Sequence, residues 1–175
     1  MTVRSMTATL VVACAGIACS PDLHWREVRP DRSGLSVLLP CKPAGQARRL
    51  TLAGVPVEMS LFACSTGGVT FAVGFADVGQ AALVGRALDE LAQAAARNIG
   101  SPGPLASEPV SVQGATPQPQ SRRLAFAGQL PDGQRVDEQL AVFAHGTRIY
   151  QATMVGARLD AEATESFIGS LRLSP

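Results

Sequence analysis

Two runs of alternating side chains, joined by four turn-forming residues, constrain the fold of this chain more than any other feature. The run VPVEMSLFAC at 55–64 places Val, Val, Met, Leu and Ala on one face. The run VTFAVGFADV at 69–78 likewise places Val, Phe, Val and Phe on one face. Such alternation is typical of strands with one buried face, and STGG between them favours a tight turn. The sequence therefore predicts a long β-hairpin within an antiparallel sheet.

Other segments read as strands connected mainly by short turns. "LSVLLP" ends at a proline, "ARRLTLAG" alternates, and "PDG" forms a turn between two later runs. Because hairpin connections join antiparallel neighbours, we expect the sheet to be largely antiparallel. The expected strands cover residues 35–40, 47–54, 121–130, 134–145 and 146–156.

Two helices are predicted, one between the two groups of strands and one near the end. Residues 80–99 carry an apolar stripe at three- and four-residue steps, with Asp77 as a candidate start cap and Gly100 as a candidate end cap. A final helix opens at Asp160, with Phe167, Ile168 and Leu171 facing inward. We expect an α+β fold in which two main helices pack on the sheet, and a flexible loop at 101–120.

The first nineteen residues resemble a bacterial export signal. Arg4 precedes an apolar run from Met6 to Ala18, too short to span a membrane. "GIACS" resembles a lipobox, which predicts that Cys19 is acylated and becomes the first mature residue. Cys14 is a rival, because Val11, Val12 and Ala13 precede it. Cleavage without lipid, and a buried N-terminal helix, are the alternatives.

This interpretation sets the expected organisation and location of the chain. Residues 1–19 form a signal peptide with a lipobox, 20–34 a tether and a first strand, and 35–175 a single α+β domain. The protein is expected in the bacterial cell envelope, lipid-anchored and facing the periplasm, with a soluble periplasmic protein as the alternative. The membrane is then one partner, through the anchor, and an envelope protein is a candidate second.

Cys41 and Cys64 remain once the other two cysteines are assigned to the leader. An even pair in an exported chain predicts a disulfide, worth roughly 3 to 4 kcal/mol for a loop of about 24 residues. Two separate buried thiols are the alternative. No histidine or further cysteine stands at metal-ligand spacing, and no C-x-x-C motif occurs, so we expect neither a metal site nor a redox centre.

Charge is nearly balanced, with fifteen basic and fourteen acidic side chains. No basic excess indicates a nucleic-acid partner. Arg48, Arg49, Arg122 and Arg123 form two pairs on separate predicted strands. If those strands are neighbours, one arginine of each pair meets an anionic surface; ordinary solubility is the alternative.

Trp25, the sole tryptophan, is expected to pack on the domain rather than lie at a membrane interface.

No catalytic constellation is visible, and no cofactor is expected. His24 lies in the predicted tether, and His145 lies at a predicted turn where a histidine is usually solvated. Asp137 and Glu138 are adjacent, but neighbours in a strand point to opposite faces and share no substrate. We expect both carboxylates to lie on a solvated strand edge.

A resemblance to a known fold family adds to these expectations. "LLPCKP" is similar to a corner found in many small exported bacterial proteins, and "FAVGFADV" leads into a long amphipathic helix as it does in them. The resemblance, over roughly residues 35–172, is to the PsbP/Mog1-like α/β/α fold, with Cys41 where the pattern often has glycine. It implies an α/β/α sandwich, and PsbP-like members act as accessory proteins.

Together these features predict a non-enzymatic accessory or binding module at the periplasmic membrane surface. An enzyme whose site is assembled from scattered polar residues, and a purely structural envelope component, are the alternatives. The sequence does not indicate the oligomeric state of the protein.

Overall fold

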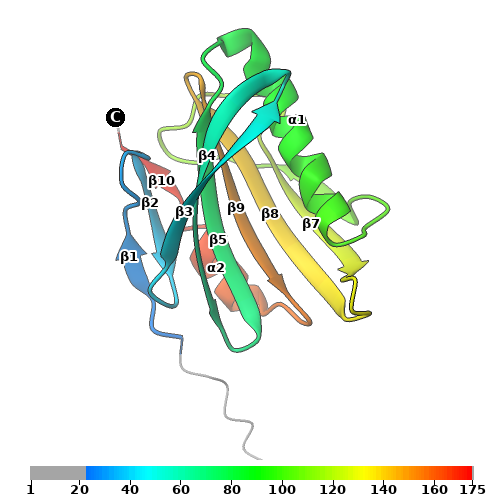
Figure 1. Cartoon of the computed structure of the whole chain (residues 1–175). Coiled ribbons are helices and arrows are strands. Elements are labelled where there is room, and N and C mark those ends of the chain that lie inside the picture. Colours follow the sequence, from blue (N-terminus) through cyan, green and yellow to red (C-terminus); the bar gives the residue numbers. More distant parts are fainter. Residues whose placement is uncertain (1–22, 175) are drawn as a thin grey trace, which may run out of the picture.

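The computed structural model describes residues 23–174, and its middle layer is a large antiparallel sheet (Figure 1). Hairpins connect most of its strands, as the alternating runs predicted. β9 pairs with β5, so the two groups of hairpins join at the centre. In spatial order the seven strands are β3 (Ala44–Leu52), β4 (Val55–Thr66), β5 (Val69–Asp77), β9 (Arg148–Gly156), β8 (Arg135–His145), β7 (Arg122–Gln129) and β6 (Ala106–Pro109).

One long helix, α1 (Ala81–Asn98), covers one face of this sheet. The predicted stripe is its buried face, and Gly100 follows the helix end at φ 62°, a conformation that glycine adopts without strain. The expectation that Asp77 caps the start was wrong. Asp77 instead accepts a hydrogen bond from the Gly79 N–H at 2.8 Å, while Gln80 occupies the cap position without a side-chain bond.

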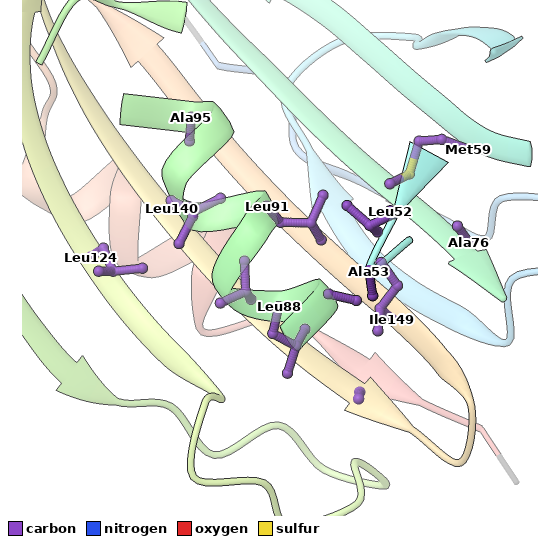
Figure 2. Packing of buried hydrophobic residues seen from close by; sticks show 14 of the residues in the cluster. Leu52, Ala53, Met59, Ala76, Leu88, Leu91, Ala95, Leu124, Leu140 and Ile149 are labelled. Carbon is purple, nitrogen blue, oxygen red and sulfur yellow. The ribbon is translucent and has the colours of Figure 1, made fainter. Parts of the chain in front are cut away.

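The core between α1 and the sheet is mainly aliphatic (Figure 2). The β3–β4 hairpin bends over this core. In its turn, the Ala53 N–H donates a hydrogen bond of 2.6 Å to the Glu90 carboxylate of α1. That bond fixes the hairpin tip against the helix. Residues fully buried or nearly so in this cluster include Met59, Val84, Leu88, Leu124, Leu140, Val142 and Ile149.

The opposite face of the sheet is covered by short elements from both ends of the described chain. They are the helix α2 (Ala161–Ile168) and a three-stranded sheet of β1 (Arg26–Val28), β2 (Leu35–Leu39) and β10 (Arg172–Leu173). β2 is the central strand and pairs antiparallel with both neighbours. Asp160 caps α2 as predicted, accepting from the Ala163 N–H at 2.8 Å. An α+β fold with a mostly antiparallel sheet and two helices is therefore confirmed.

The core on this second face contains a cluster of aromatic side chains among its aliphatic ones. Phe71 meets Phe167 of α2 edge-on, with ring centroids 5.5 Å apart. Trp25 packs edge-on against Phe71 at 5.9 Å, in agreement with the expectation that it packs on the domain. Phe143 and Tyr150 stack at 5.1 Å. Most of the buried aromatic side chains thus lie on this face of the sheet, whereas the face under α1 is almost entirely aliphatic.

Two cross-links tie the small sheet to the large one. Cys41, just after β2, is disulfide-bonded to Cys64 in β4, which confirms the predicted pair. The buried Ser33 carbonyl accepts from the Tyr150 hydroxyl at 2.7 Å, and the Ser33 hydroxyl accepts from the Leu35 N–H at 2.9 Å. Both bonds position the chain at the start of β2.

The segment 101–120 contains a strand that the sequence did not predict. β6 pairs with β7 at the edge of the large sheet, and Gln113 forms an isolated bridge with Arg172. β6 has four residues, all exposed, so no alternation of apolar side chains marks it. The expectation of a loop throughout residues 101–120 was wrong for Ala106–Pro109, which form β6.

Candidate functional site

A groove of about 570 Å³ lies where the described chain begins. The β4–β5 turn forms one wall, and the connection from β9 into α2 forms the other. We call it the N-terminal groove. Its lining residues are Leu23, Thr66, Gly67, Val69, Phe71, Met154, Arg158, Leu159, Asp160, Ala161, Glu162 and Ala163.

The groove has an apolar floor and a charged rim. Phe71 and Met154 on the floor are each 1% exposed. Arg158 and Glu162 on the rim are exposed, and Asp160 is engaged in capping α2. The accessible surface of the groove therefore combines apolar and charged side chains. Leu23 lies in the wall, and the candidate lipidation sites Cys19 and Cys14 lie outside the described residues.

The two arginine pairs do not come together. Arg48 and Arg49 lie on β3, at one edge of the large sheet, and β4, β5, β9 and β8 separate them from Arg122 and Arg123 on β7. The condition for a shared contact with an anionic surface, that the two strands are neighbours, is therefore not met. Only the β3 pair is exposed.

The β7 pair instead connects the sheet to both helices. Arg122 forms an ion pair with Asp89 of α1. Arg123, on the other face, reaches Glu165 of α2 with 2.6 Å between its Nη1 and the carboxylate Oε1. Adjacent residues of a strand point to opposite faces, so one dipeptide contacts two layers. The sequence around Arg122 and Arg123 did not indicate these ion pairs, because each acidic partner lies on a helix far away in the sequence.

Glu138 is a buried carboxylate, so the prediction that it lies on a solvated strand edge was wrong. β8 lies between β9 and β7 rather than at an edge, so Glu138 is 3% exposed while Asp137 is exposed. Its register neighbours are Phe126 and Val155, and its Oε2 has no hydrogen-bond partner. Desolvation by burial raises the pKa of this carboxyl to about 7. The alternation of β8 carried the signal, since Glu138 shares a face with Val136.

The histidines show no catalytic arrangement in the described chain. His145 is exposed at the end of β8, and its Nδ1 lies 2.7 Å from the Gly114 carbonyl oxygen. His24 is exposed before β1. Within residues 23–174, no group of three or more His, Cys, Asp or Glu side chains is placed to hold a metal ion.

Comparison with known proteins identified no relative of this chain. The chain matches no protein-family model, and no curated protein is similar enough to count as a relative. Of the helices within residues 23–174, neither has the length and apolar character needed to cross a membrane.

Proposed function

We propose that this protein is an exported bacterial envelope lipoprotein that acts as a non-enzymatic accessory or binding module at the periplasmic membrane surface. The observation that carries the proposal is the disulfide between Cys41 and Cys64. Structural disulfides form and persist in oxidising compartments such as the bacterial periplasm, and are rare in the cytosol. The disulfide thus supports the same location as the signal-like leader.

Lipid attachment at Cys19 would place the anchor close in sequence to the N-terminal groove. Leu23, in the wall of the N-terminal groove, is four residues beyond Cys19 in the sequence. Four residues span at most about 14 Å even when fully extended. An acylated Cys19 would therefore hold the groove close to the bilayer. The apolar floor and charged rim of the groove suit that interfacial position.

The fold proposal is that the three layers form a PsbP/Mog1-like α/β/α sandwich. Its support is the sheet with α1 on one face and α2 on the other, together with the corner "LLPCKP", which ends β2 and leads into β3. PsbP-like members act as accessory proteins, which agrees with a role in binding rather than catalysis.

The proposal is tested by the intact mass of the full chain, expressed with its leader in a bacterium and purified from the membrane fraction. We expect a chain that starts at Cys19, carries acyl mass, and lacks two hydrogen atoms because of the disulfide. Cys19→Ala should abolish the acyl mass and release the protein from the membrane, whereas Cys14→Ala should change neither. An uncleaved chain with four free thiols would overturn the proposal.

A further inference from the structure

We infer that the free edge of β3 is a docking site for an extended acidic segment of a partner protein, which adds to the sheet as an eighth strand. The inference rests on the proposed role as a binding module and supplies the chemistry of the partner. Four features of β3 carry it: an open edge, a fixed position, unpaired charge, and a register that disfavours a second copy of the chain.

The outer edge of β3 is open along its whole length. In the sheet order β3 is terminal and pairs only with β4. Eight of its nine residues are exposed, which shows that no other element in residues 23–174 covers it. In an antiparallel pair, every second residue directs its N–H and C=O groups away from the partner. β3 therefore presents a row of free backbone donors and acceptors to solvent.

The opposite edge of the same sheet lacks this character. β6 has four residues and ends in Pro109, which has no N–H to donate. Short edge strands and prolines are ordinary protections against the addition of another strand. β3 is nine residues long and contains no proline. The sheet thus has one blunted edge and one edge long enough for peptide recognition.

β3 is also held in place before any partner arrives. The Ala53 N–H donates to Glu90 of α1 at 2.6 Å just beyond its end, and Cys41, three residues before its start, is disulfide-bonded to β4. A strand fixed at both ends loses little conformational entropy when a partner binds, which favours affinity.

The charged side chains on β3 indicate which kind of partner segment this edge would bind. Arg48 and Arg49 point to opposite faces of the sheet, and neither forms an ion pair with any described residue. Glu58 lies opposite Arg49 in register, but no ion pair joins them. An incoming strand with two adjacent acidic residues would place one carboxylate beside each arginine, on the two faces. The partner segment is therefore extended, with an acidic pair at its centre.

A second copy of this chain fits the edge poorly. If two β3 strands paired antiparallel with full overlap of Ala44–Leu52, Arg48 of each copy would lie directly opposite Arg48 of the other. Like charges in directly opposed positions destabilise strand pairing. The same arginines that attract an acidic segment thus disfavour self-association, and an acidic partner is the occupant that the charge pattern supports.

The test uses peptides of about ten residues, a length suited to strand addition. Each alternates threonine with valine, and the centre is either an aspartate–glutamate pair or two lysines. The purified full chain is compared with Arg48→Glu/Arg49→Glu and with Arg26→Glu/Arg135→Glu, which makes the same charge change at exposed sites on β1 and β8. Binding is measured by fluorescence anisotropy at low salt, and the site is mapped by amide NMR shifts.

We expect the acidic peptide to bind the unmodified chain and to shift amides of β3. Arg48→Glu/Arg49→Glu should weaken that binding about tenfold or more and favour the lysine peptide instead, while the β1/β8 control variant behaves like the unmodified chain. Equal binding to all variants, shifts outside β3, or no binding would overturn the inference. So would binding of anionic lipid vesicles, but not peptide, that depends on Arg48 and Arg49. None of these outcomes affects the acylation measured by intact mass, so the two proposals fail separately.

Discussion

The two faces of the large sheet are covered in different ways, and the difference shows how a layer can be stabilised. On one face a single helix, α1, buries an aliphatic stripe along its length. On the other, α2 and three short strands come from both ends of the described chain and surround an aromatic cluster. The first layer is one continuous segment, joined to the sheet by the Ala53–Glu90 hydrogen bond and the Arg122–Asp89 ion pair. The second depends on a disulfide, the hydrogen bonds of Ser33, and large side chains.

The largest effect is expected from truncating one side chain in each layer. Phe167→Ala should lower the free energy of unfolding by about 4 kcal/mol, because a fully buried ring is lost from the aromatic cluster. Leu88→Ala in α1 should lower it by about 3 kcal/mol. Chemical denaturation measures both, with Leu105→Ala, at a 74% exposed site, as a control that changes little. A loss under about 1 kcal/mol for Phe167→Ala would contradict the dependence on aromatic packing.

The disulfide should matter more to the second layer than to the first. Cys41→Ser/Cys64→Ser removes a cross-link between residues 23 apart, worth about 3 kcal/mol in the chain-entropy model. Trp25 is the sole tryptophan and lies in the aromatic layer, so its fluorescence reports on that layer, while far-UV circular dichroism follows the whole fold. In the variant we expect the fluorescence transition to occur at lower denaturant. Coincident, unshifted transitions would show that the disulfide is dispensable.

The buried carboxyl of Glu138 should make the stability of the first layer depend on pH. Below about pH 4.5, its ordinary pKa, the carboxyl is neutral in both the folded and the unfolded state. Between that value and the folded pKa of about 7, the unfolded chain ionises while the folded chain keeps its proton, so stability falls as pH rises. Above pH 7 the loss levels off, at up to about 3 kcal/mol.

Glu138→Gln should remove this slope, because the amide does not ionise. Relative to the unmodified chain, we expect the variant to gain up to about 3 kcal/mol at pH 8 and to differ by less than about 1 kcal/mol at pH 5. Denaturation at a series of pH values measures the difference. Asp137→Asn, at the exposed neighbour, is the matched control and should leave the slope intact. An equal gain at both pH values would contradict the assignment to ionisation.

The stripe of α1 and the β4–β5 hairpin are the features that the sequence pattern predicted most directly. The stripe of α1 repeats every three or four residues, and the hairpin of β4 and β5 alternates over long runs, so each signal lies within one segment. Asp160 and the disulfide were predictable for the same reason, since a cap and an even pair of cysteines are recognisable without the fold.

The features that escaped prediction depend on which strands become neighbours. β6 and β10 are too short to carry a periodic pattern, and they form because β7 and β2 offer them an edge. Arg122 and Arg123 looked like surface charge until α1 and α2 were placed on either side of β7. The free edge of β3 likewise follows from the strand order, which no single segment of the sequence contains.

The position of β2 between β1 and β10 has a consequence for the order in which parts of the chain fold. β2 lies near the start of the described chain, and Leu35 pairs with Leu173 near its end. The hairpins and α1 involve close neighbours in sequence and can form early, whereas the small sheet closes only when β10 pairs with β2. Non-local pairing of this kind is slow, since a long loop must be ordered first. The aromatic face of the sheet is therefore covered late in folding, and until then its exposed apolar side chains favour aggregation.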